Sequence, residues 1–374
     1  MSVVFAANTD IKRMTPHNNT IHLVHKENSP KISGLDVFSA RHYIFYSVEA
    51  LAEIHHLNLF DGKETIVDVP GKPILLRLDW LSENVYYVDN GENKKFVVCH
   101  MDRKKCASLQ MVEDKELVTA FVIDPINRLM FYALTAWGPI DHSHSTIYKA
   151  DLDGTHIVKI VSDNLTLCSG LAIDYEKKML YFSDQQENKI ESVNYEATHR
   201  QLLLKDNTFI IKPYKLDLFE EEIYFTSFGT MKLTRCKVFG EKKCMSTNLH
   251  VYGADFFKLD QTSKQMNLRD ECMLYNCTNI CVMAPLGPKC LCSDQTAVAP
   301  GVECNSTDQD VRTFIIFDSF VDINSAQVTG LRMGHTMFRP VSKFLLVLYL
   351  LTMLHLIIGV KIDPWCCHLK QFKQ

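Results

Sequence analysis

Short apolar runs recur along the first two thirds of the chain, and each is followed by an aspartate and then by a second, aromatic run. Runs of this length that are bounded by turn residues are typical of β-strands, so each pair indicates an inner strand and its neighbour. Turn signals such as Asp61-Gly62, Asp153-Gly154 and Phe239-Gly240 predict the hairpins that follow. The pattern therefore predicts an all-β protein.

The paired runs form an internal repeat whose copies recur every 43, 45, 50 and 43 residues. A period in the forties that is built of short strands is typical of propeller blades with four strands each. Because five copies at equivalent places cannot all be one active site, we interpret the central aspartate as structural, accepting backbone N–H groups at a strand junction. The five aspartates are Asp36, Asp79, Asp124, Asp174 and Asp217.

Two incomplete units lie at the ends of this repeat region. The N-terminal run VVFAANTDIKRM has no inner strand before it, and HVYGADFF at 250–257 is an inner strand with no aromatic run after it. Together they predict a sixth blade built from both ends, which leaves no open sheet edge. The sequence thus predicts a six-bladed β-propeller over residues 1–268.

The thirteen cysteines are grouped rather than scattered, and this grouping indicates an oxidising compartment. Two pairs, Cys99/Cys106 and Cys236/Cys244, flank predicted hairpins, where opposed positions can meet disulfide geometry. Cys168 has no evident partner and is interpreted as a small buried residue. Six more cysteines follow the spacing C-x4-C-x3-C-x8-C-x-C-x11-C. Zinc is the alternative for this group, but paired CxxC spacings and an HxxxH partner are missing from it.

A run of seventeen residues without charge, at 344–360, is predicted to be a transmembrane helix. A buried core helix is the alternative, but the run follows the folded modules near the chain end. Basic residues flank both sides, so the disulfide-rich part decides the orientation: residues 1–343 lie outside and the tail 361–374 lies in the cytosol. Cys366 and Cys367 in that tail stand where palmitoylation occurs. The N-terminus lacks a signal-peptide pattern, so we expect the natural protein to have an upstream portion.

The net charge of -4 and the pI near 6.4 argue against nucleic acid as a partner. An enzyme is the alternative that needs weighing, since other six-bladed propellers are hydrolases with a metal in the central channel. Such a site needs acids and an Asn or His from several blades, and the acids at regular positions here are interpreted as structural. We therefore predict no catalytic, cofactor or metal site.

The LD-x-YWTD-like repeat and the cysteine run CMLYNCTNICVMAPLGPKCLC together resemble the YWTD propeller and epidermal-growth-factor-like (EGF-like) pair of the low-density lipoprotein receptor family. Within that family, the hairpin cysteines and the segment ALTAWGPIDHSHSTIYKADLDGT look most like insect vitellogenin (yolk protein) receptors. The resemblance covers residues 1–304. It implies an EGF-like module at 269–304 with the disulfides Cys272–Cys281, Cys277–Cys290 and Cys292–Cys304. Leu268 and Met283 stand where calcium-binding members carry polar ligands, so no calcium is predicted there.

The resemblance implies a membrane-anchored endocytic receptor for a lipoprotein or a vitellogenin-like ligand, in which the propeller serves pH-dependent ligand release and recycling. Ligand capture in this family belongs to calcium-binding cysteine-rich repeats, and this chain contains none. The tail also lacks an NPxY or dileucine signal, which leaves open a non-endocytic propeller that binds a signalling or matrix protein. Residues 305–343 are predicted to be a linker or, from TFIIFDSFVDI, the start of a truncated further propeller.

Histidine titrates between the pH of the cell surface and that of the endosome, so surface histidines are the candidate pH sensors. We select His55, His56, His142 and His144, because adjacent or near-adjacent imidazoles respond to pH together. Among four N-x-S/T triplets, Asn18, Asn164 and Asn305 are the expected glycosylation sites.

Overall fold

The structure of this chain is a computed structural model with two compact units, Met1–Cys304 and Asn305–Gln374, and each is described by itself. The residues that the structure describes are 2–15, 20–26, 31–101, 105–112, 116–138, 143–205, 208–230, 232–240, 243–249, 254–260, 265, 271–304, 314–319, 322–329 and 332–337.

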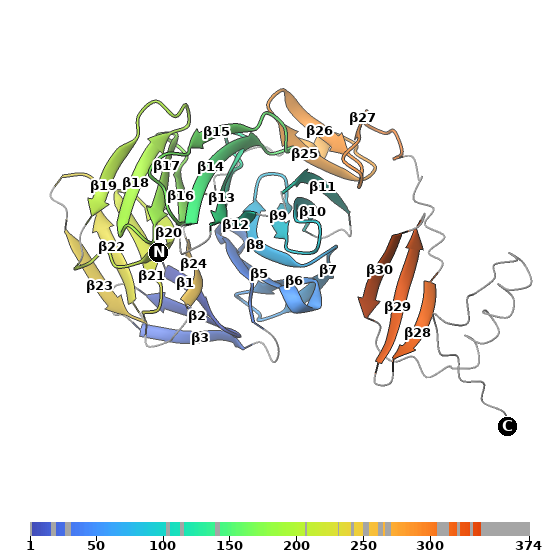
Figure 1. The fold of residues 1–374 in the computed structure, drawn as a ribbon, viewed down its shortest axis with the longest axis horizontal. Coiled ribbons are helices and arrows are strands. Elements are labelled where there is room, and N and C mark those ends of the chain that lie inside the picture. The colour runs from blue at the N-terminus through green and yellow to red at the C-terminus, as the bar shows by residue number, and fades with distance from the viewer. Residues whose placement is uncertain are drawn as a thin grey trace, which may run out of the picture. The chain divides into compact units, whose positions relative to one another are not determined.

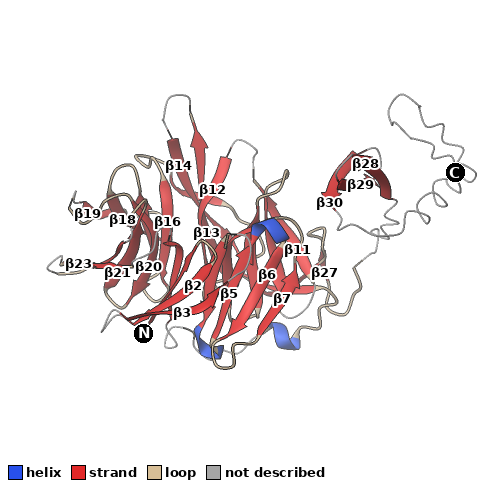
Figure 2. Ribbon diagram, turned by 90° about the horizontal axis from the view of Figure 1, so that it is seen from below, coloured by secondary structure: helices blue, strands red, loops and turns tan. Residues whose placement is uncertain are grey.

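Six four-stranded antiparallel sheets, A to F, occupy most of the first unit, and Figure 2 shows how completely strands dominate it. Sheet A contains β24 (Ala254–Asp260), β1 (Ser2–Ala7), β2 (Asp10–Thr15) and β3 (Thr20–Lys26). Sheet B contains β4 (Gly34–Phe38), β5 (Tyr43–Val48), β6 (Glu53–Asn58) and β7 (Glu64–Asp68). Sheet C contains β8 (Pro73–Asp79), β9 (Asn84–Asp89), β10 (Lys95–His100) and β11 (Cys106–Met111).

The other three sheets repeat the same order along the chain. Sheet D contains β12 (Glu116–Asp124), β13 (Leu129–Trp137), β14 (Ser143–Asp151) and β15 (Val158–Val161). Sheet E contains β16 (Cys168–Asp174), β17 (Met179–Asp184), β18 (Lys189–Asn194) and β19 (Gln201–Lys205). Sheet F contains β20 (Pro213–Phe219), β21 (Glu222–Ser227), β22 (Lys232–Lys237) and β23 (Cys244–Asn248).

The first strand of each sheet lies against the first strands of its two neighbours. Contacts run from β24 to β4, β8, β12, β16 and β20 in turn, and β20 contacts β24 again, so that the sheets surround a common centre (Figure 1). Sheet A joins the two ends of the ring, because β24 pairs with β1 through partners such as Phe257 and Phe5. The all-β, propeller-like fold predicted from the repeat is confirmed. The inner strand expected at 250–257 is described from Ala254 to Asp260.

The second strand of each sheet is apolar on both faces because both faces are covered. In β9, Val85 and Tyr87 enter the hydrophobic cluster between sheets B and C, whereas Tyr86 and Val88 enter the cluster between sheets C and D. Alternate side chains of a strand point to opposite faces, so a continuous apolar run serves two cores at once. This is why the aromatic runs of the repeat have no polar alternation.

Short elements complete the description. Sheet G, which follows the ring, contains β25 (Ile280–Ala284), β26 (Gly287–Leu291) and β27 (Ala297–Val298), and sheet H of the second unit contains β28 (Phe314–Ser319), β29 (Asp322–Thr329) and β30 (Arg332–Met337). The 3-10 helices of the described residues are η1 (Ser39–Arg41), η2 (Glu49–Leu51) and η4 (Cys272–Leu274). Sheet H adds two strands to the single strand expected near residue 314.

Within the residues that the structure describes, no helix is long and apolar enough to cross a membrane. The predicted membrane helix at 344–360 and the tail at 361–374, with Cys366 and Cys367, lie outside those residues.

Candidate functional site

Two of the five recurring aspartates join neighbouring sheets. One oxygen of Asp36 accepts the backbone N–H of the next residue, and the other accepts the N–H of Leu78 at 3.0 Å, which links sheet B to sheet C. Asp217 does the same with Leu259 at 2.9 Å, linking sheet F to sheet A. These carboxylates therefore act as clips between innermost strands.

The other three aspartates accept N–H groups of the turn that follows their own strand. Asp79 accepts from residues two and three positions ahead at 3.1 and 3.2 Å, and Asp174 does so at 3.2 and 3.0 Å. Burial raises the pKa of Asp124, although hydrogen bonds from Asn127 and Tyr195 oppose the shift. All five aspartates thus accept backbone N–H groups, which supports their structural interpretation.

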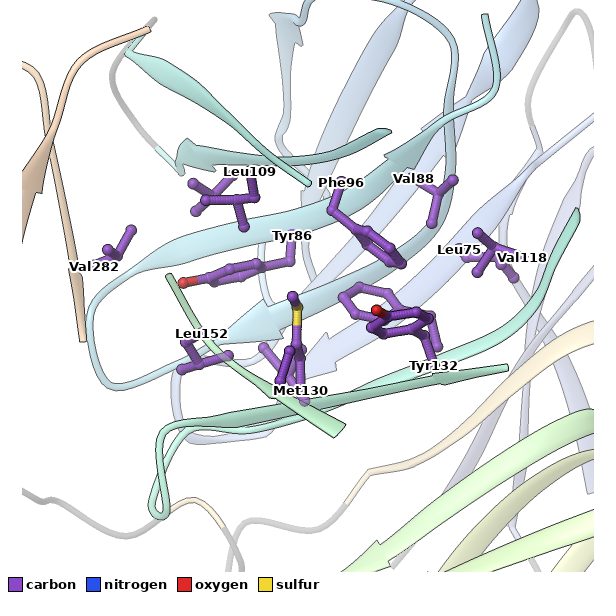
Figure 3. Packing of buried hydrophobic residues seen from close by; sticks show 14 of the residues in the cluster. Leu75, Tyr86, Val88, Phe96, Leu109, Val118, Met130, Tyr132, Leu152 and Val282 are labelled. Carbon is purple, nitrogen blue, oxygen red and sulfur yellow. The ribbon is translucent and has the colours of Figure 1, made fainter. Parts of the chain in front are cut away.

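A disulfide-bonded module formed by sheet G packs against sheets C and D. Its side chains Ile280, Val282 and Leu291 are buried and share one hydrophobic cluster with Tyr86 and Leu109 of sheet C. Figure 3 shows the Tyr86 ring between the two sheets, with its hydroxyl end toward Val282. The module therefore covers a core that sheets C and D alone would leave open to water.

Polar contacts fix the module in place around that apolar contact. The side-chain amide of Asn84 donates to the backbone carbonyl of Cys281 at 2.7 Å. Arg128 donates to the carbonyl of Ala284 at 3.1 Å and pairs with Glu271 at 2.7 Å. These contacts join turns of sheets C and D to separate points of the module, so the module is held in one orientation.

A buried carboxylate forms a further tie between sheet D and the module. Lys289 of the module lies 2.7 Å from Asp153, whose side chain is almost fully buried. Burial raises the pKa of the Asp153 carboxyl, but hydrogen bonds from Lys289 and Thr155 outweigh this effect, so the pKa is lowered overall. The carboxylate therefore stays ionised well below neutral pH.

Ten of the eleven cysteines among the described residues form disulfides. The bonded pairs are Cys99–Cys106, Cys236–Cys244, Cys272–Cys281, Cys277–Cys290 and Cys292–Cys304. The first two join directly opposed positions of the outer hairpins β10–β11 and β22–β23. Cys168 is a free, buried thiol, and burial raises its pKa, so it is not a reactive group.

The candidate histidine His55 lies inside a polar cluster between sheets A and B and not on a rim. Its Nδ1 is 3.1 Å from the Tyr46 hydroxyl and 3.2 Å from Glu64, and its Nε2 is 3.2 Å from Glu53. His25 of β3 reaches the same hydroxyl at 3.1 Å, and Tyr46 also donates to Glu64. His55 is only 2% exposed, so its side chain lies inside the protein.

The other candidate histidines are separated from His55. His56 follows it in the same strand and therefore points to the opposite face of sheet B, where its ring lies 5.3 Å from that of Phe45. His144 is exposed on β14, and His142 lies outside the described residues. Adjacency in sequence thus does not bring His55 and His56 together, and His144 is the candidate that the structure places at the surface.

Sequence reasoning missed the residues that hold the module and the partners of His55. Asn84 and Cys281 are 197 positions apart, and His25 and Tyr46 belong to different sheets. Residue spacing in the sequence does not predict such contacts. Asp153 was visible only as part of a predicted Asp-Gly turn.

The predicted glycosylation sites are described in one case. Asn164 is exposed in the turn before β16, whereas Asn18 and Asn305 lie outside the described residues. Among the described residues, no group of three or more His, Cys, Asp or Glu side chains is placed to hold a metal ion.

The ring of sheets defines the class of the protein as a β-propeller. A solved chain in the crystal structure of a nidogen/laminin complex aligns with a TM-score of 0.56 and 20% identity, covering 67% of this chain and 94% of that one. At this level of identity the likeness establishes the fold alone. No family model matches the chain.

Two proteins with similar sequences are vitellogenin receptors. The vitellogenin receptor of Solenopsis invicta is 30% identical over 82% of this chain, and the vitellogenin receptor Yl of Drosophila melanogaster is 21% identical over 81%. A human low-density lipoprotein receptor-related protein 5-like protein is 26% identical over 46% of this chain and 66% of its own length. The resemblance to the low-density lipoprotein receptor family, and within it to vitellogenin receptors, is confirmed. This chain spans 17% and 15% of the two vitellogenin receptors.

Proposed function

We propose that this chain is the propeller and EGF-like portion of an endocytic lipoprotein or yolk-protein (vitellogenin) receptor, and that it serves pH-dependent ligand release and receptor recycling. The observation that carries the proposal is the 30% identity to a vitellogenin receptor over 82% of the chain. Ligand capture then belongs to cysteine-rich repeats that are not part of this chain.

In this proposal the six sheets are the blades of one six-bladed YWTD-type propeller over residues 1–268, and residues 269–304 are an EGF-like module. The closed series of contacts among innermost strands supports the blade count, and the three disulfides around sheet G support the module. Residues 305–343 are a linker or the start of a further propeller, 344–360 the membrane helix and 361–374 the cytoplasmic tail.

The proposed location is the cell membrane, with a single span and the N-terminal part facing the outside or the endosomal lumen. Five disulfides within one unit support an oxidising compartment, because such bonds are rare in the cytosol. With a signal peptide supplied, at least one of Asn18, Asn164 and Asn305 should carry glycan. Unglycosylated protein whose N-terminal part is digested by protease outside intact microsomes would contradict this location.

The proposal excludes catalysis as the function. The recurring aspartates are engaged with backbone N–H groups, and the relatives named above are receptors. Binding to a protein partner at the surface is the activity that remains, and nucleic acid is not among the proposed partners.

The test of acid-dependent release is binding of the chain to a cysteine-rich repeat of the receptor family at about pH 7.4 and about pH 5.5. We expect tighter binding at the lower pH, because protonated surface histidines face the acidic groups of such a repeat. His142→Ala with His144→Ala should remove the difference, whereas His156→Ala, in an exposed turn, serves as the matched control. Equal affinity at both pH values would refute the release mechanism.

A second candidate function is a non-endocytic extracellular propeller that binds a signalling or matrix protein. One solved chain with a similar fold belongs to a nidogen/laminin complex, and this likeness concerns the fold alone. Uptake of fluorescent vitellogenin by cells that express the full receptor separates the two functions, because only an endocytic receptor internalises its ligand.

A further inference from the structure

A cavity lies at the centre of the ring, where the innermost strands end. Its volume is about 60 Å³, and all six innermost strands contribute to its lining. Its residues are distinct from those that hold the module and from the histidine cluster. What it binds follows from the charges, hydrogen-bond donors and apolar walls that surround it.

The charged groups that line the cavity balance one another. Asp36 and Asp217 already accept two backbone N–H groups each, and the Lys258 ammonium lies 3.8 and 3.7 Å from their carboxylates. Arg77 is the second cation. Two positive and two negative groups leave no net charge, and the acceptor oxygens of both carboxylates are engaged.

Some hydrogen-bond donors of the cavity, by contrast, have no acceptor among the described residues. Arg77 uses its Nη1 for the carbonyls of Leu76 at 2.6 Å and Leu35 at 3.4 Å, while its Nε is buried and has no acceptor among the described residues. Within the same part of the chain, nothing accepts a hydrogen bond from Arg77 Nη2 or from the Tyr175 hydroxyl. Leaving a buried donor such as Arg77 Nε unsatisfied is unfavourable, so the cavity favours a ligand that brings an acceptor.

The Tyr175 hydroxyl is a hydrogen-bond donor in this cavity. Burial raises the pKa of the Tyr175 hydroxyl, and Asp124, Asp36 and Asp217 raise it further against the opposing effect of Arg77. The phenol therefore stays protonated and can donate. Because the four charged lining groups already balance one another, an uncharged acceptor meets the donors at a smaller desolvation cost than an anion.

The remaining wall of the cavity is apolar and includes Val122, Leu171 and Ile173. We propose that this cavity binds a small uncharged molecule with a carbonyl oxygen and an aliphatic group. The carbonyl accepts hydrogen bonds from Arg77 and Tyr175, and the aliphatic group lies against the apolar wall. Small-molecule sites commonly combine an apolar lining with a few polar groups that orient the ligand. This site is independent of the proposed receptor function.

The test compares three probes on the full chain. Isobutyramide carries both required groups, isobutyrate has the same shape with a negative charge, and acetamide lacks most of the aliphatic part. Trp80 lines the cavity, so its fluorescence reports binding once the other two tryptophans, Trp137 and Trp365, are replaced by Phe. Isobutyramide should bind about tenfold more tightly than either comparison compound. Isobutyrate binding as tightly as isobutyramide, or no saturable response to isobutyramide, would overturn the proposal.

Two variants test the donors. Tyr175→Phe removes only the hydroxyl and should weaken isobutyramide binding about tenfold. Tyr43→Phe removes a hydroxyl outside the cavity and should leave the affinity unchanged. Arg77→Gln, read only if it retains the fold by circular dichroism, should weaken binding at least as much. Wild-type affinity in Tyr175→Phe would contradict the assignment of the carbonyl to this donor.

Discussion

The seam between sheets C and D differs from the seam between sheets A and B. In the described residues, the C–D seam holds nineteen buried apolar residues, three of them from the disulfide-bonded module, whereas the A–B seam holds nine. The A–B seam adds a polar cluster in which His25 and His55 meet Tyr46, Glu53 and Glu64. One seam is thus covered and apolar, and the other contains ionisable groups.

The module that covers the C–D seam is also held by polar contacts. The ties between the module and sheets C and D include amide, arginine and lysine contacts, and the pKa of the Asp153 carboxyl among them is lowered. The tie between Lys289 and Asp153 therefore persists in mildly acidic solution.

The largest effect should come from the apolar seam itself. Phe96 has no exposed surface and its ring lies 5.1 Å from Phe121 and 4.7 Å from Tyr132. Phe96→Ala should lower the free energy of unfolding by about 4 kcal/mol, because it removes a buried ring and leaves a cavity. Urea denaturation measures this loss. Leu23→Ala on the exposed face of β3 is the control, and a loss at Phe96 no larger than the control's would break the comparison.

A smaller loss is expected where the module meets the seam. Val282 is fully buried against sheet C, so Val282→Ala should cost about 2 kcal/mol. Hydrogen exchange should become faster in β25 and β26, because their docking is weakened. Val302→Ala, at a half-exposed position of the same module, should leave exchange unchanged. Unchanged exchange in Val282→Ala would mean that the module does not depend on sheet C.

A smaller loss of stability is expected in the polar cluster of the A–B seam. Tyr46→Phe removes the hydroxyl that His25, His55 and Glu64 share, and the loss of these hydrogen bonds should cost about 1.5 kcal/mol. Thermal unfolding near neutral pH measures the change, with Tyr43→Phe at the start of the same strand as the control. If both substitutions have the same small effect, the cluster does not stabilise the seam between sheets A and B.

The smallest effect concerns the tie between Lys289 and Asp153, because the lysine is partly exposed and solvent screens the pair. Lys289→Met should cost about 0.5 kcal/mol near neutral pH. Because the folded pKa of Asp153 is below the ordinary value of about 3.9, the contribution is complete above that value and is lost as the pH falls through the lower folded value. The cost should thus be the same at about pH 7 and about pH 5.5. A cost that has disappeared at about pH 5.5 would contradict the lowered pKa of Asp153.

Much of the fold was accessible from the sequence because the second strand of each sheet is buried on both faces. A run such as that around Tyr86 and Tyr87 must then be apolar throughout, and its repetition along the chain indicates the repeated sheets. The composite sheet A followed from the two incomplete units. The sequence does not show which aspartates bond to a neighbouring sheet and which bond to the following turn. Asp36 and Asp79 both follow a leucine at the end of an apolar run, but they have different partners.

The site was harder to predict for a similar reason. The contacts of Asn84 with the module and of His25 with Tyr46 join distant segments and leave no periodic signal. His55 and His56, although adjacent in sequence, lie on opposite faces of sheet B because neighbours in a strand alternate. The module's disulfide pattern came with the family resemblance, since six cysteines allow many pairings on spacing alone.

The most direct test of the account is peptide mapping of non-reduced protein recovered from a secretory host. The account predicts five linked pairs: Cys99 with Cys106, Cys236 with Cys244, Cys272 with Cys281, Cys277 with Cys290, and Cys292 with Cys304. It also predicts that Cys168 is recovered as a free thiol. Free thiols at the ten paired positions would contradict the extracellular receptor assignment.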